Sequence, residues 1–273
     1  MRNLFRFGMV FLPVILLGAI IGYNISWRSQ ITSIPMDLFD TLENHSLTPV
    51  KSDALRMEVV NKILAQLDSS AAITEIKHSA ELMIPVQVVR CNLDSVSIYL
   101  KPSAISADIY SKFAKELDAA VSPKVERVVL DLRGTAGDNY DAAIRIADEF
   151  LSGDKLIAYA KSIHTSTQEF RAQRPGLYEE GRLELLVDNL TSGASEVICA
   201  AIKSWKRGLL IGTKTAGEAL RKERFVIEDK FEITIPTLRY FSPDGDRLQK
   251  NFAENTTGGI SPDSVVDFKS HAL

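Results

Sequence analysis

The chain has 273 residues, of which 45% are hydrophobic and 25% are charged. These are ordinary values for a globular protein, and they exclude collagen-like and intrinsically disordered chains. The net charge of −3 at pH 7 is unevenly distributed, because residues 1–28 contain three arginines and no acidic residue. The rest therefore carries 29 basic against 35 acidic residues, or −6. A mildly acidic body argues against nucleic acid as a partner.

Residues 7–23 form an uncharged, mostly apolar run. About 17 such residues are the minimum for a helix that spans a bilayer. Arg2 and Arg6 precede the run and Trp27 follows it, which favours a cytoplasmic N-terminus. We therefore expect a single-pass anchor in the cell membrane, with the body on the periplasmic, or extracytoplasmic, side. A cleaved signal peptide is the alternative, although no clean small-residue cleavage site follows Gly22.

The sequence predicts three segments: a membrane anchor or signal peptide at residues 1–28, a tether with a helical segment at 29–89, and a core domain at 90–273. Apolar residues at four-residue steps predict a helix over 52–70 in the second segment. This helix could pack on the core or pair between two subunits, so an oligomer is possible. Residues 84–90 are interpreted as the join to the core.

The core alternates short apolar runs with amphipathic stretches of helical length. We expect strands at 93–100, 125–132, 155–163, 182–188 and 208–213, and helices at 103–121, 140–151 and 195–205. This alternation predicts an α/β fold with a mainly parallel sheet covered by helices. Residues 224–241 are different, because two strand-like runs flank a polar turn at Asp229–Lys230 and predict an antiparallel pair.

Two cysteines, Cys91 and Cys199, lie far apart in the sequence. Their spacing fits neither a disulfide framework nor a metal site, so we expect two buried thiols. The sequence implies no metal and no cofactor.

Two glycine-containing corners stand where a predicted strand ends and a helix begins, which is where active sites of α/β proteins gather. The first reads DLRGTAGDNYDAA (131–143), and the second reads NLTSGASEVICAAI (189–202). Glycines in such corners let backbone N–H groups face a ligand, as an oxyanion site requires. Glu196 opens the second helix, where a structural role at the positive end of the helix dipole is the simpler interpretation.

Four segments, taken together and in order, resemble one family. They are VVLDLRGTAGDNYDAAIRIADEFLSG, LTSGASEVICAAIKSWKRGLLIGTKTAGEA, LRYFSPDG and GGISPDSVV. From about residue 90 to residue 268 the chain resembles the tail-specific, or C-terminal-processing, serine peptidases. The resemblance implies a core related to the ClpP and crotonase group, export from the cytoplasm, and a serine–lysine dyad that needs no histidine.

The dyad positions are substituted when the family's motifs are carried onto this chain. The family's serine corner reads Ser-Ala-Ser-Ala-Ser-Glu, with the nucleophile three residues before the glutamate. Anchored on Glu196, the nucleophile position is Gly193. The family's lysine turn corresponds to GTKTAGEA, which places Glu218 at the general-base position and Lys222 at that of a supporting glutamine.

The resemblance also implies an oxyanion site and a strand that binds peptide. The family's double glycine is Gly137 followed by Asp138 here, and Ala194 follows the nucleophile position. Gly137 and Ala194 are therefore expected as the oxyanion donors. The strand after the lysine turn is expected to bind an extended peptide through Phe225, Val226 and Ile227.

A PDZ module, which many members insert before the core to grip a carboxyl terminus, is not expected. Only about 20 residues separate the predicted helix at 52–70 from the predicted strand at 93–100. Such a module is several times longer.

Glycine has no side chain that could attack a carbonyl, and glutamate cannot replace a neutral lysine as base. The sequence therefore predicts a membrane-anchored, catalytically inactive homologue that binds peptides, a protein partner or an active relative. One alternative is a divergent serine endopeptidase with a relocated pair, and another is a purely structural scaffold for assembly. The relocated pair would come from Ser192, Ser195, Lys214 and Lys222.

Overall fold

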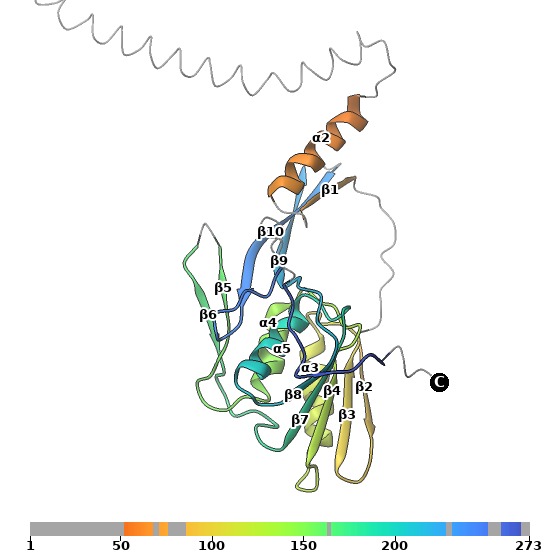
Figure 1. Ribbon diagram of the computed structural model, residues 1–273, viewed down its shortest axis with the longest axis vertical. Coiled ribbons are helices and arrows are strands. Elements are labelled where there is room, and N and C mark those ends of the chain that lie inside the picture. Colours follow the sequence, from red (N-terminus) through yellow and green to blue (C-terminus); the bar gives the residue numbers. More distant parts are fainter. Residues whose placement is uncertain are drawn as a thin grey trace, which may run out of the picture. The chain divides into compact units, whose positions relative to one another are not determined.

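A computed structural model describes residues 52–67, 71–75, 86–162, 165–227, 231–250 and 258–268 (Figure 1). The chain divides into two compact units, residues 1–67 and residues 68–273. In the first unit the described residues form helix α2 (Ser52–Leu67), within the range predicted for a helix. The predicted anchor at residues 7–23 lies outside the described residues. Among the helices that are described, none has both the length and the apolar character needed to cross a membrane.

The larger sheet of the second unit has the strand order β11-β8-β7-β4-β3-β2. Its strands are β2 (Val88–Asn92), β3 (Ser97–Pro102), β4 (Arg127–Asp131), β7 (Arg182–Val187), β8 (Leu209–Gly212) and β11 (Ser264–Val265). All neighbours run parallel except β2, which is antiparallel to β3. The predicted parallel arrangement is therefore confirmed for the centre of this sheet.

The other sheet is antiparallel throughout. Its strands are β1 (Ala72–Glu75), β5 (Leu156–Lys161), β6 (Gln168–Arg171), β9 (Leu220–Ile227) and β10 (Phe231–Phe241). The antiparallel pair predicted over 224–241 is confirmed as β9 and β10. The expectation of one mainly parallel sheet is too simple, because the fold as a whole is mixed.

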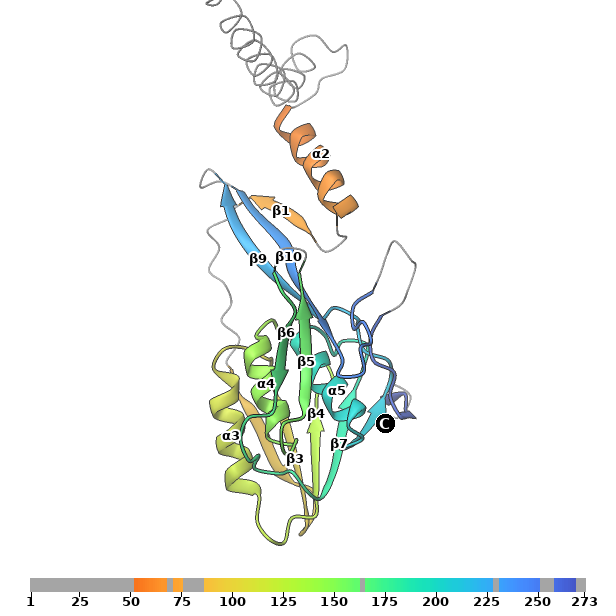
Figure 2. The same cartoon turned by 90° about the vertical axis from the view of Figure 1, so that its left-hand side faces the viewer.

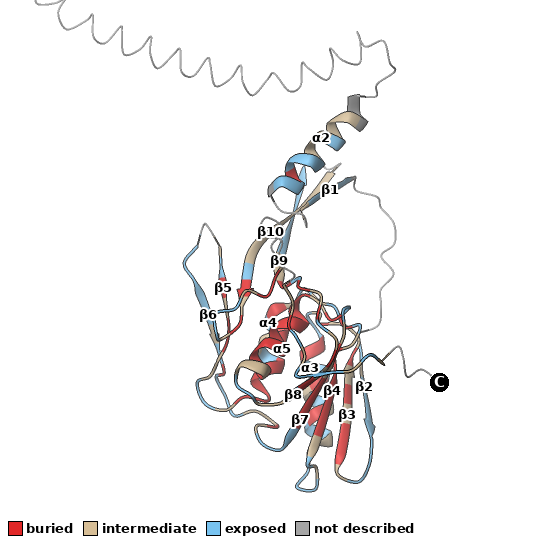
Figure 3. Ribbon diagram, in the orientation of Figure 1, coloured by how far each residue is buried: buried red, intermediate tan, exposed pale blue. Residues whose placement is uncertain are grey.

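Three helices lie between the larger sheet and strands β5 and β6 (Figures 1 and 2). They are α3 (Ile109–Ala120), α4 (Tyr140–Asp148) and α5 (Ala194–Ser204). Helix α5 is buried from Ala194 to Ile202, and seven of these nine residues are apolar. Figure 3 shows that α4, α5 and strands β4 and β7 are largely buried, whereas β9 is largely exposed.

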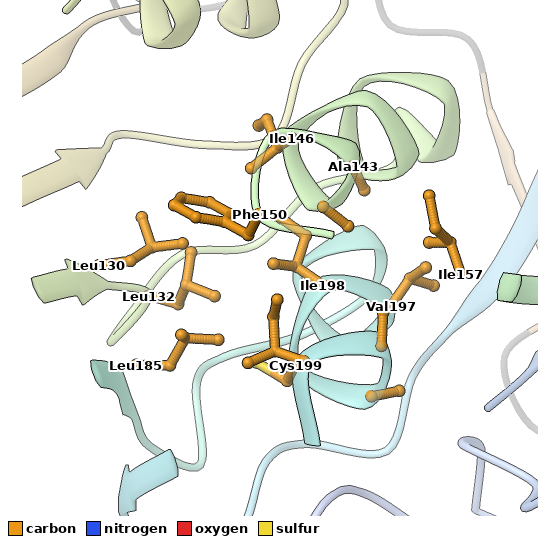
Figure 4. Packing of buried hydrophobic residues seen from close by; sticks show 14 of the residues in the cluster. Leu130, Leu132, Ala143, Ile146, Phe150, Ile157, Leu185, Val197, Ile198 and Cys199 are labelled. Carbon is orange, nitrogen blue, oxygen red and sulfur yellow. The ribbon is translucent and has the colours of Figure 1, made fainter. Parts of the chain in front are cut away.

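The core forms where α5 meets the larger sheet and α4. Ile198 and Cys199 of α5 lie among Leu130, Leu185 and Phe150, and the first two of these partners come from the neighbouring strands β4 and β7 (Figure 4). Burial of one such aliphatic or aromatic side chain contributes about 1.5–3 kcal/mol. Packing on this scale holds the strand ends and helix starts that form the two corners.

Some details differ from the sequence-based expectations. Helix α3 begins at Ile109 rather than at residue 103, because Ile105 is used in an isolated parallel bridge to Gly137. Strand β2 includes part of the stretch interpreted as a join. Cys199 is buried as predicted, but the prediction of a buried thiol at Cys91 is wrong. Cys91 lies on β2, which pairs only with β3 among the described strands and is therefore open to solvent.

The end of β4 is fixed by a buried carboxylate. Asp131 accepts hydrogen bonds from the Tyr99 hydroxyl (2.6 Å) and from Nε and Nη2 of Arg133 (2.9 and 2.7 Å). Burial alone would raise the pKa of Asp131, but the bonds from Arg133 and Tyr99, aided by the charge of Lys101, lower it to about 2. The ionised carboxylate thus sets the direction in which the chain enters the first corner.

Candidate functional site

The two glycine corners predicted from the sequence meet in the structure. The first follows β4 and leads into α4, and the second follows β7 and leads into α5. Because β4 and β7 are parallel neighbours, their carboxyl ends lie side by side. Backbone bonds join the corners, from Ser192 N to Thr135 O (3.3 Å) and from Ala194 N to Gly137 O (2.8 Å).

Gly193, which was predicted to stand at the nucleophile position, is the N-cap of α5 and has φ 64° and ψ −123°. Residues with a side chain rarely adopt this backbone conformation. In α/β-hydrolases, an unrelated group, the nucleophile also sits on a strained turn from strand to helix. A Cβ atom on Gly193 would collide with the carbonyl oxygen of Gly137. The corner thus keeps a strained strand-to-helix turn and leaves no room for a side chain on it.

The expected oxyanion donors are in direct contact with each other. The N–H of Ala194 donates to the carbonyl of Gly137, so this amide already has an acceptor. Gly137 is itself held against Ile105, whose Cβ and carbonyl oxygen would each lie 2.5 Å from a Cβ added to Gly137. Only glycine fits there.

Glu196 joins the serine corner to the lysine turn. Its buried carboxylate accepts hydrogen bonds from Thr215 Oγ1, Gly217 N and Glu218 N, each 2.6 Å long, and from Gly193 N at 3.2 Å. Burial raises the pKa of Glu196, and the four donors oppose that rise. Glu196 therefore does more than cap α5, because it also binds the turn that contains Thr215, Gly217 and Glu218.

This carboxylate brings together the two positions that were predicted to correspond to the dyad. The backbone N–H groups of Gly193 and Glu218 bind the same oxygen, Oε2 of Glu196. The side chain of Glu218 is exposed, and Lys222 is exposed on β9. The backbone at position 193, which is glycine, and at position 218, which is glutamate, is thus held around one oxygen.

The residues considered for a relocated pair lie in different surroundings. Ser195 is fully buried, and its Oγ has no hydrogen-bond partner within the described part of the chain. Ser192 is half-buried in the turn before Gly193. Lys214 is exposed and borders a pocket of about 650 Å³ together with Ser242. The lining given for that pocket includes neither Ser192 nor Ser195, and the relocated pair stays a prediction.

Sequence reasoning missed an aromatic pair next to the site. The rings of Tyr140, at the start of α4, and Tyr240, in β10, stack at 3.9 Å between centroids and 6° between planes. Burial raises the pKa of both phenols, that of Tyr240 to about 12. Gln249 holds Tyr240 in place through a bond from Nε2 to its carbonyl (2.6 Å). No spacing in the sequence connects these residues, so only the tertiary structure reveals them.

The described residues contain no group of three or more His, Cys, Asp or Glu side chains that could hold a metal ion. Two parallel strands end in glycine turns, α5 starts at the second of these turns, and Glu196 ties the turn after β8 to that start. This is the backbone outline expected from the resemblance. Fold and site therefore define the class of a peptidase-like α/β protein.

Comparison with known proteins gives the family. The model of peptidase family S41 matches residues 98–266, and the chain belongs to this family. A carboxyl-terminal-processing protease of Synechocystis sp. is 28% identical over 223 residues, covering 78% of this chain and 50% of that protein. The chain thus spans about half the length of this curated relative.

Solved structures support the fold. A photosystem II D1 C-terminal processing protease has a TM-score of 0.55 at 21% identity, over 72% of this chain and 48% of that one. A lipoprotein from Streptococcus agalactiae has a TM-score of 0.60 at 14% identity, over 86% and 91% of the two chains. The predicted relation to C-terminal-processing peptidases is confirmed.

The contact between Gly193 and Gly137 gives a stability prediction. We expect Gly193→Ala to lower the free energy of unfolding by more than about 2 kcal/mol, because positive φ and a collision act together. Gly153→Ala is the matched control: Gly153 has φ 71°, but a Cβ there would meet nothing within 4 Å. This control should lose only about 1 kcal/mol. Urea unfolding of the full chain, followed by circular dichroism, measures both; equal losses would contradict the collision.

Proposed function

We propose that this chain is a non-catalytic member of family S41 that is anchored in the membrane and binds extended peptide segments outside the cytoplasm. One observation carries the proposal. Glu196 holds positions 193 and 218, where the resemblance places the nucleophile and the base, around a single oxygen, yet these positions are glycine and glutamate. The peptide could belong to a substrate-like tail, a protein partner or an active relative.

The chemistry of the two positions supports the absence of catalysis. Acyl transfer needs a nucleophile, and loss of the nucleophile alone costs on the order of a millionfold in kcat in a serine hydrolase. A glutamate at position 218 has no amino group, so it cannot act as the neutral amine that activates a serine. The amide of Ala194, which would stabilise an oxyanion, is bonded to Gly137.

We expect the full-length protein to show no serine-dependent proteolysis. Labelling with a fluorophosphonate and cleavage of an unfolded protein substrate are the measurements. The same background signal is expected from the natural chain, from Ser192→Ala, from Ser195→Ala and from the control Ser204→Ala. Cleavage that survives in Ser204→Ala but disappears in Ser192→Ala or Ser195→Ala would show a relocated nucleophile and overturn the proposal.

Strand β9 is the surface on which a peptide could bind. It pairs only with β10 among the described strands, so its other edge is open. Phe225, Val226 and Ile227 near its end are 47%, 58% and 42% exposed. An extended peptide can add to such an edge through backbone hydrogen bonds, a mode that needs no catalytic side chain. Glu218 would favour Lys or Arg in the peptide, although an exposed ion pair contributes only ~0–1 kcal/mol.

The register of β9 shows which amides face outward. Pro236 of β10 is opposite Lys222 and has no N–H, so a mutual hydrogen-bonded pair cannot form there. Hydrogen-bonded and non-hydrogen-bonded pairs alternate along an antiparallel ladder. Val226, opposite Glu232, lies four residues after Lys222, so its pair is also of the non-hydrogen-bonded kind. In a non-hydrogen-bonded pair, the N–H groups of the two residues point away from the partner strand. The N–H of Val226 is therefore assigned to the open edge.

We expect Val226→Pro to weaken peptide binding by about tenfold, because it removes one donor from the open edge. Val226→Ala keeps the N–H and should change the affinity much less. A peptide array identifies ligands, and titration of the full-length variants with one such peptide gives the dissociation constants. Circular dichroism checks that both variants are folded. Equal affinities for the two variants would remove β9 from the proposal.

The anchor is proposed from residues 7–23, which are uncharged and follow two arginines. A reporter enzyme that is active only outside the cytoplasm, fused to the C-terminus, should be active with the full chain and inactive when residues 1–28 are deleted. The mass of the mature chain separates an intact anchor from a cleaved signal peptide. Reporter activity without residues 1–28 would contradict the proposed topology.

A further inference from the structure

The contact between Ala194 and Gly137 is more than a link between two loops. Ala194 is the first residue of α5, and the first N–H groups of a helix have no partner within that helix. These groups carry the positive end of the helix dipole and bind anions or carbonyl oxygens readily. Here the partner of Ala194 N is the carbonyl oxygen of Gly137, at 2.8 Å.

The Gly137 carbonyl thus lies where an acyl-transfer enzyme would hold the carbonyl oxygen of its substrate, because the N–H after the nucleophile is the usual donor to that atom. The same oxygen also fills the volume that a side chain on Gly193 would need. We propose that the Gly137–Asp138 peptide is an internal ligand of this site, and that Asp138 is the positioning residue that keeps its carbonyl turned inward.

The backbone at Asp138 explains the second part of this proposal. Turning the peptide over, so that its N–H faces α5, would change ψ of Gly137 and bring φ of residue 138 to a positive value. Among the described residues other than glycine, only Lys206 has a positive φ, so φ of Asp138 is not positive. A residue with a side chain resists that change, whereas glycine accepts it. The side chain of Asp138 is exposed, so its effect on the peptide is exerted through the backbone.

The neighbours of this peptide hold it from both sides. Gly137 forms the isolated bridge to Ile105, and the N–H of Asn139 donates to the Ile105 carbonyl at 3.2 Å. The Asn139 side chain in turn accepts from Ala142 N (2.8 Å) and caps α4. The peptide can therefore turn over only about the two bonds that flank it, which makes residue 138 decisive.

Hydrogen exchange at one amide tests the proposal. The inference rests on the proposed function, because an internal ligand explains why this site would not catalyse. The measurement itself depends on neither proteolysis nor peptide binding. Residue-resolved hydrogen–deuterium exchange of the full-length protein should show a protected N–H at Ala194. In Asp138→Gly its exchange should be about tenfold faster, while that of Cys199 in the middle of α5 should be unchanged.

Asp138→Ala is the matched control, because it removes the carboxylate and keeps the Cβ atom. Its Ala194 exchange should equal that of the natural chain. Three results would overturn the proposal: an unprotected Ala194 amide in the natural chain, no acceleration in Asp138→Gly, or equal acceleration in both variants. The last result would mean that the carboxylate, not the backbone, holds the peptide.

Discussion

The buried carboxylate of Glu196 is the interaction on which the rest of the site depends. Its two oxygens receive donors from the start of α5 and from the turn that follows β8. Hydrogen bonds to a charged group contribute about 1.5–3 kcal/mol, and a buried donor left without a partner costs a similar amount. Glu196 therefore couples the corner at 189–202 to the turn after β8, and neither could change its conformation without affecting the other.

This coupling does not depend on the side chains at positions 193 and 218. The bonds to Glu196 come from backbone amides and from Thr215, so they do not depend on the side chains at positions 193 and 218. Glycine also suits φ of +64° better than serine does. The framework around positions 193 and 218 is thus independent of which side chains stand there, and glycine at position 193 keeps backbone strain low.

The sequence contained enough to predict the central parallel strands, the helix that became α5 and the two glycine corners, since these follow from short apolar runs and from glycine placement. It could not show that Gly137 O is the acceptor for Ala194 N, because peptide orientation leaves no trace in residue spacing. Nor could it join Tyr140 to Tyr240, which lie in separate elements. Strand β2 was missed because it is an exposed edge strand, and such a strand need not have an apolar sequence.

The character of the side chains changes along β9. Its first part carries four successive charged residues, Arg221 to Arg224, and its last three described residues are apolar. Charged side chains on an open edge discourage pairing with a second strand, whereas an apolar edge invites it. The apolar end of β9 therefore favours pairing with another strand more than its charged beginning does. The same feature restricts unwanted self-association, because two copies can meet edge to edge over only a few residues.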